Sequence, residues 1–302
     1  MPSLQLFLST YTFDPISAIV LLGLALPYIA GIRRLKAAGQ TWPRRRTAAF
    51  LVAGVGSLAW IDFGFLGTYS TDLRWAFTTR ITLTLLVFPL LASLGNPIAL
   101  AKQALSPNGL RRLNKTLDSW PVRLMSNAVF APLFVLVFFM FFVTPIAGFW
   151  RQSSLVEALF TVLLPLVGMV MVLPLITTQR PKTTLFLAGE FIIAFVELML
   201  DAVPGVVLSI SDTILDGVHS VGIHSAAWSL SALDDQHFSG NLLWMIAEGA
   251  DLPLLIMLMI RWRRSDRAEA RKTDELSDED YEALVQQHLG SGLGGTTVQS
   301  DE

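Results

Sequence analysis

The sequence predicts an all-α, polytopic membrane protein with seven transmembrane helices, an amino terminus outside the cell and a cytoplasmic carboxyl terminus. Hydrophobic residues make up 53% of the 302 residues and charged residues only 15%, which is unusual for a soluble protein. Long apolar runs recur along the chain, and Lys and Arg collect in alternate connections between them. The three observations agree because an odd number of spans places the two termini on opposite sides.

Each expected span is a run of mainly apolar residues that can cross a hydrocarbon core of ~30 Å as a helix of about 20 residues. Charge, proline or glycine bounds each run. The second, third and sixth runs carry ionisable groups, which lower their hydropathy without forbidding a buried helix. The seven runs cover 15–32, 47–66, 76–97, 125–145, 156–177, 184–209 and 241–262.

The orientation follows from the basic residues. All but three of the 22 Lys and Arg residues fall on one side when the seven runs alternate direction, mostly in loops 33–46 and 98–124 and after the last run. Cytoplasmic loops accumulate positive charge, so this side is expected to be cytoplasmic. The three exceptions are Arg74, Arg80 and Arg151.

Two regions differ in composition, a transmembrane domain over 1–264 and a charged cytoplasmic tail over 265–302. Within the tail, the pattern from Ser277 to Gly290 predicts one short amphipathic helix, and the Gly-, Ser- and Thr-rich end has too little apolar surface to fold. The amino terminus lacks a basic segment and a small-residue cleavage site. We therefore do not expect a removable signal peptide there.

Several classes of protein are excluded or disfavoured. The absence of cysteine excludes disulfides, thiolate metal sites and cysteine nucleophiles. A net charge of −2 provides no global basic field for nucleic acid. The sequence contains no Gly-rich phosphate loop, no GxSxG elbow and no HExxH motif. We expect a protein that is not an enzyme and that binds no nucleic acid.

Carboxylates inside the apolar runs point to a polar interior. Glu190, Glu197 and Asp201 are spaced by seven and four residues, which places them on one stripe of a helix that cannot face lipid. Arg80 is the intramembrane cation available to pair with them, and Asp62 lies at a similar depth. The group could be a buried ion-pair network that fixes helix packing, or a site that handles protons or cations.

Three of the four histidines fall in the expected outer loop 210–240, namely His219, His224 and His237. Imidazole suits copper or zinc, and Asp216, Asp234 and Asp235 could complete the ligand shell. The interval of five residues between the first two histidines is not the helical spacing that would place both on one face, which weakens the case for a metal site. Because of the imidazole groups, copper is still a possible cofactor, and no other cofactor is indicated.

The stretch "DQHFSGNLLW" resembles the Asp-Gln-x-x-x-Gly-x-x-x-Trp signature in the last span of CtaG-type cytochrome c oxidase assembly proteins. "AAGQTWPRRRTAAFLVAG", "FPLLASLGNPIAL" and "RWRRSDRAEARKTD" are similar to other segments of that family, so the resemblance covers residues from about 14 to 285. It implies seven spans in a bacterial plasma membrane, with subunits of a haem-copper cytochrome oxidase as partners. The residues that match the signature are Asp235, Gln236, Gly240 and Trp244.

The resemblance also indicates how the last span sits in the bundle. Glu248 and Asp251 follow the signature and are expected to face the carboxylates of the sixth span across the bundle. The expected intramembrane polar network is then Asp62, Arg80, Glu190, Glu197, Asp201, Glu248 and Asp251.

One departure from the family affects the functional reading. Members usually carry His-x-x-x-His on the third span, and those positions fall at about Phe77 and Ile81, which cannot bind a metal. The leading hypothesis is therefore a non-enzymatic factor for assembly of, or stable association with, a haem-copper oxidase. A copper carrier that uses the outer histidines is the first alternative. A proton-coupled transporter that uses the carboxylate stripe and Arg80 is the second.

Overall fold

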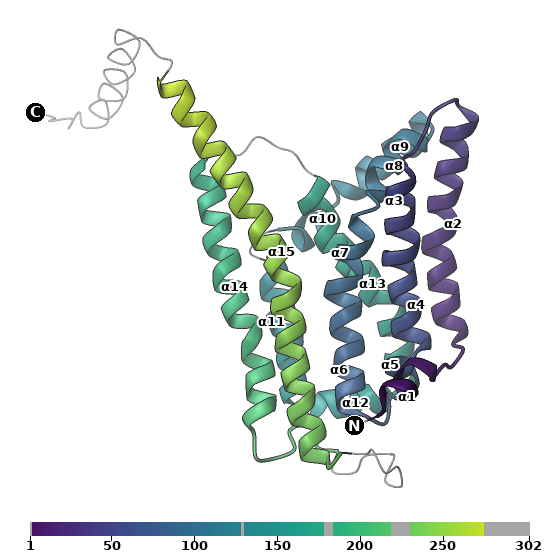
Figure 1. Ribbon diagram of the computed structural model, residues 1–302, viewed down its shortest axis with the longest axis vertical. Helices are drawn as coiled ribbons and strands as arrows, with labels where there is room; N and C mark the ends of the chain where they lie inside the picture. Colours follow the sequence, from purple (N-terminus) through teal and green to yellow (C-terminus); the bar gives the residue numbers. More distant parts are fainter. Residues whose placement is uncertain (1, 128–129, 178–183, 219–229, 275–302) are drawn as a thin grey trace, which may run out of the picture.

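The computed structural model describes residues 2–127, 130–177, 184–218 and 230–274, and every regular element in these ranges is helical (Figure 1). The expected tail helix over 277–290 and the end of the tail lie outside the described residues. The elements are α1 (Leu4–Ser9), α2 (Pro15–Ala37), α3 (Arg44–Ala48), η1 (Ala49–Val55), α4 (Gly56–Phe63), α5 (Phe65–Thr68), α6 (Arg74–Thr82), η2 (Leu83–Val87), α7 (Phe88–Ser93), α8 (Pro97–Ala104), α9 (Pro107–Leu117), α10 (Trp120–Met125), α11 (Phe130–Met140), η3 (Phe141–Val143), α12 (Pro145–Gln152), α13 (Ser154–Thr177), α14 (Thr184–Ile210) and α15 (Ala232–Asp274).

Five helical segments of the described residues are long and apolar enough to cross a bilayer, so the chain is a multi-pass membrane protein. A sixth candidate is a broken span, because α11 with η3 meets α12 at an angle of 87°. Pro145 is the first residue of α12, and Thr144 before it is extended, which explains the break. The five unbroken segments are Pro15–Ala37, Arg44–Thr68, Arg74–Ser93, Ser154–Leu173 and Phe191–Ile210.

Two connections between the expected spans contain more helix than the sequence indicated. The segment 98–124 folds largely into the short helices α8, α9 and α10. The expected outer loop up to residue 240 is shorter, because α15 already begins at Ala232. The hydroxyl of Ser231 accepts the backbone N–H of Asp234 at 3.1 Å, and the acidic residues in the first turn favour a helix start at this point.

The seventh expected span lies within α15, which also continues beyond the expected domain boundary at Ser265 to Asp274. In Figure 1, α14 and α15 run antiparallel and side by side along the height of the molecule, and they form the most extensive helix pair among the described residues. The seventh span and the orientation of the termini remain predictions.

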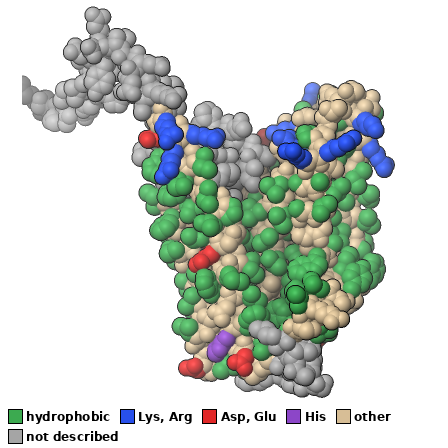
Figure 2. Space-filling view, in the orientation of Figure 1, with side chains coloured by type: hydrophobic (Ala, Val, Ile, Leu, Met, Phe, Trp, Pro, Cys, Tyr) green, Lys and Arg blue, Asp and Glu red, His purple; other side chains and the backbone are tan. Residues whose placement is uncertain are grey.

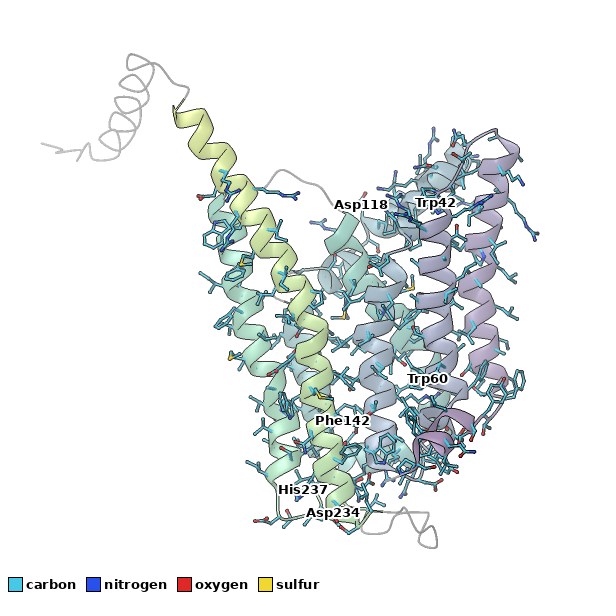
Figure 3. The ribbon with its side chains drawn as sticks, in the orientation of Figure 1. Trp42, Trp60, Asp118, Phe142, Asp234 and His237 are labelled. Atoms are coloured by element: carbon cyan, nitrogen blue, oxygen red, sulfur yellow. The ribbon has the colours of Figure 1, made fainter. Side chains whose placement is uncertain are left out.

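Charges separate along the molecule. Figure 2 shows Lys and Arg side chains gathered at one end, over the ends of α2 and α15 and the α8–α9 region. We call this the basic end. The opposite end carries acidic side chains and a histidine (Figure 2), and Figure 3 labels His237 and Asp234 of the first turns of α15 there. The chain that follows α14, residues 212–218, lies at the same end. We call this the distal end.

Three clusters of buried apolar side chains hold the bundle together. One joins α6 and η2 to α11, α13, α14 and α15, and it includes Phe77 and Ile81. A second joins α2 to η1, α4, α7 and α8. The third lies at the distal end around Phe65 and Trp75, where the amino-terminal helix α1 packs onto α5. The helix α6 therefore stands at the centre of the bundle, and all of its residues are buried.

Candidate functional site at the distal end

The start of α6 is capped by a side chain from another helix. Leu73, at the N-cap position, provides no side-chain cap. The carboxylate of Asp235 on α15 instead accepts the backbone N–H of Arg74 at 2.9 Å and that of Trp75 at 3.1 Å. These N–H groups have no partner within α6, so the carboxylate satisfies them and also lies favourably at the positive end of the helix dipole.

Two arginines and a second aspartate extend this cap. Arg74 forms an ion pair with Asp216 at 2.8 Å, and its guanidinium lies 3.6 Å from Asp235. Arg151 of α12 pairs with the other oxygen of Asp216 at 3.2 Å and donates to the carbonyl groups of Thr71 and Asp72. All four charged side chains are at most 6% exposed. We call Arg74, Arg151, Asp216 and Asp235 the distal ion cluster.

The cost of burying charge in this cluster is only partly offset. Burial raises the pKa of Asp235, and this effect outweighs the lowering by the backbone hydrogen bonds from Arg74 and Trp75 and by the positive charges of both arginines. The Nε atoms of Arg74 and Arg151 are buried without a hydrogen-bond partner. A cavity of about 20 Å³ adjoins the cluster, which is enough for one water molecule.

The two residues after Asp235 hold the chain that follows α14. The side chain of Gln236 is fully buried and acts in both directions, accepting the N–H of Leu215 at 2.8 Å and donating to the carbonyl of Thr213 at 2.9 Å. Nε2 of His237 donates to the carbonyl of Ser211 at 2.9 Å. Figure 3 shows His237 beside this segment at the distal end. Residues 211–215 are thus fixed by hydrogen bonds from one turn of α15.

Further along α15, small residues allow a close approach to α14. A methyl group added at Gly240 would lie 2.7 Å from the backbone nitrogen of Ser209, and closer still to the carbonyl of Gly205. A methyl group at Gly205 would lie 2.8 Å from Cβ of Trp244. Neither position can carry a side chain without separating the helices. Each of the four signature residues therefore holds α15 against α6, α14 or residues 211–215, through a hydrogen bond or through close packing.

A separate ion cluster lies deeper in the bundle, around Arg80 of α6. Nε of Arg80 pairs with Asp62 of α4 at 3.0 Å, and Nη1 pairs with Glu157 of α13 at 2.7 Å. Nη2 donates to the hydroxyl of Thr161 at 3.0 Å, and Ser70 also contacts the guanidinium. Arg80 therefore joins three helices, and a cavity of about 20 Å³ lies beside it.

The expected intramembrane network is therefore not one continuous group in the described residues. The structure brings Asp62 to Arg80, whereas Asp201 and Asp251 lie on the facing helices α14 and α15. Glu190 and Glu197 belong to α14, but their side chains lie outside the described residues.

The described residues provide no grouping of three or more His, Asp or Glu side chains that could hold a metal ion. Two members of the expected copper site, His219 and His224, lie outside these residues, so the site as a whole stays a prediction. Asp216 and Asp235, considered as further ligands, are instead engaged by arginines.

Sequence reasoning did not identify Glu157 as a partner of Arg80, or Arg74 and Arg151 as members of an ion cluster. One signal could have found the arginines. Arg74, Arg80 and Arg151 are the three basic residues that the charge partition leaves over, and all three form buried ion pairs. The basic residues that do not fit the cytoplasmic charge pattern are thus the ones that form ion pairs inside the bundle.

Comparison with known proteins gives the family. The profile of the cytochrome c oxidase caa3 assembly factor family, CtaG, matches residues 26–265. An uncharacterized protein of Mycobacterium bovis and one of Mycobacterium tuberculosis are each 25% identical over 93% of this chain and 43% of their own length. An uncharacterized protein of Mycobacterium leprae is 24% identical over the same shares. The chain thus spans less than half the length of these curated relatives. No solved structure gives a significant match. The chain belongs to the caa3 assembly factor family.

Proposed function

We propose that this member of the caa3 assembly factor family promotes assembly of a haem-copper cytochrome c oxidase by direct contact, in the plasma membrane of a bacterium. The observation that carries the proposal is the use of the signature residues. Asp235, Gln236, Gly240 and Trp244 are engaged in holding α15 against α6, α14 and residues 211–215. This supports a role as a rigid scaffold rather than as a catalyst.

The proposed topology has seven spans, with α15 as the last and the basic end in the cytoplasm. The charge separation in Figure 2 supports this orientation, because the basic end would face the compartment that retains positive loops. The distal ion cluster would then lie near the outer surface. Contact with the oxidase would use the membrane-facing sides of the helices or the basic residues at the end of α15, such as Arg263 and Arg267.

The chain's interior supports contact over metal transfer. Phe77 and Ile81 occupy the positions where the family resemblance expects an imidazole pair, and both are buried in the apolar cluster that joins α6 to α14 and α15. A route for copper through this part of the bundle would lack nitrogen ligands. Copper transfer through His219, His224 and His237 remains an alternative that oxidase assays can separate, as does proton-coupled transport.

Affinity purification tests the contact. The full chain, tagged and cross-linked in its own bacterium, should co-purify with haem-copper oxidase subunits. Gly240→Leu should abolish this by forcing α15 away from α14, whereas Gly249→Ala should not, because a methyl group at Gly249 meets nothing within 4 Å. Absence of oxidase subunits from the folded wild-type protein would contradict the proposal.

A further inference from the structure

We propose that Asp201 and Asp251 form a shared proton-binding site between α14 and α15, in which one carboxyl group stays protonated and donates a hydrogen bond to the other carboxylate. The site is separate from the distal ion cluster. It does not depend on the role in oxidase assembly, because it follows from the packing of two helices.

The geometry comes from the contact between Gly205 and Gly240. Asp201 lies one helical turn from Gly205 on α14, and Asp251 lies beyond Trp244 on α15, in the same direction along the antiparallel pair. Asp201 is only 2% exposed. Asp251 lies on the facing helix, and α14 and α15 pack against each other.

Both carboxyl groups contain an oxygen that is buried without a hydrogen-bond partner, Oδ1 in Asp201 and Oδ2 in Asp251. A buried polar atom without a partner costs about 1–3 kcal/mol. A proton held between the two side chains satisfies one oxygen as donor and another as acceptor. One added proton thus removes both deficits at once.

No cation among the described residues compensates these groups. The packed elements α11, η3 and η2 contain no titratable residue, and α6 contributes only Arg74 and Arg80, which already pair with other carboxylates. On the pair itself, Glu248 of α15 is a further acid near Asp251. The helix α14 also contains Glu190 and Glu197, whose side chains lie outside the described residues.

Two ionised carboxylates in this position would be strongly unfavourable. One charged side chain at the centre of a membrane helix already costs about 2.5–3.5 kcal/mol on insertion scales, and two like charges in one site repel each other. A proton is the ligand that matches two acids in an apolar seam, because it neutralises charge and needs no ligand shell.

Infrared spectroscopy of the full chain in lipid nanodiscs tests the site directly. In sodium-free buffer at neutral pH, the wild type should show the C=O stretching band of a protonated carboxylic acid, with the isotope shift expected in heavy water. Asp201→Asn and Asp251→Asn should each abolish that band. Asp212→Asn, an exposed aspartate just after α14, should retain it.

The wild type alone keeps the proposal falsifiable if the asparagine variants do not fold. Its band should disappear in alkaline buffer and return on acidification. Absence of the band at neutral pH, or its persistence in both folded asparagine variants, would overturn the proposal. Loss of the band on addition of sodium or calcium ions at constant pH would also overturn it, and would identify a cation site instead.

Discussion

The carboxylate of Asp235 accepts the backbone N–H of Arg74 at 2.9 Å, although the two residues are 161 positions apart in the sequence. The first turn of the central helix α6 is therefore completed by α15, the last helix of the described residues. The guanidinium of Arg74 in turn pairs with Asp216. Arg74 therefore connects α6 both to Asp235 on α15 and to Asp216 in residues 212–218. The distal end should behave as one cooperative unit.

Asp235→Ala should destabilise the protein by about 1–3 kcal/mol, because two helix N–H groups lose their acceptor and the buried guanidinium of Arg74 loses one of its two carboxylate neighbours. Asp234→Ala is the matched control, since Asp234 is exposed and its side chain accepts a hydrogen bond from the exposed hydroxyl of Ser231. Thermal unfolding of the two purified variants measures the difference. Equal effects of the two substitutions would show that the cap contributes nothing specific.

Gly240→Ala should cost about 1–3 kcal/mol through overpacking against α14. On the same helix, Gly249→Ala should be neutral or slightly stabilising, because its methyl group enters open space and alanine favours a helix by about 1 kcal/mol over glycine. Unfolding of both variants in the same detergent tests this. A comparable loss in Gly249→Ala would mean that helix flexibility, not close packing, sets the requirement.

Arg80→Leu should destabilise the bundle by about 3–5 kcal/mol, because it leaves the carboxylate of Asp62 buried and unpaired. Adding Asp62→Leu to Arg80→Leu should recover part of that loss, since the double variant contains one fewer unpaired buried charge. Adding the exposed Asp212→Leu instead should recover none. The unfolding free energies of the three variants decide the question, and equal values for the two double variants would refute the pairing.

Much of the fold follows from the sequence, because bilayer thickness sets the length of an apolar run. The helix in the run at 125–145 nevertheless ends at Val143, and Pro145 begins a second helix at 87° to it, a bend that apolarity alone does not report. The start of α15 was also misplaced. A Ser N-cap before two acidic residues outweighs the polar composition that suggested a loop.

The candidate site was harder to predict, because its residues meet only in the folded chain. The signature identified Asp235 and Gln236, yet no periodicity connects Asp235 with the start of α6 or Gln236 with Thr213. Partners from distant helices, such as Glu157 with Arg80, depend on how the bundle is arranged. A single sequence therefore does not show which residues of different spans contact each other.

Cysteine labelling tests the orientation, and the chain has no cysteine of its own to interfere. Arg45→Cys and Arg263→Cys should react with an impermeant reagent only after the cells are opened, because both lie at the basic end. Asp234→Cys should react in intact cells. Labelling of Asp234→Cys and Arg263→Cys from the same side would show that α15 does not cross the membrane.

The central claim, that this chain acts on the oxidase by contact, is tested most directly by deleting it and measuring assembled haem-copper oxidase with and without added copper. A contact factor cannot be replaced by a higher metal concentration, so subunit content and activity should fall and stay low when copper is added. The deletion should be rescued by the wild-type gene and by Gly249→Ala, but not by Gly240→Leu. Full recovery with copper alone would contradict contact and favour the outer histidines, and normal oxidase in the deletion strain would contradict a role in its assembly.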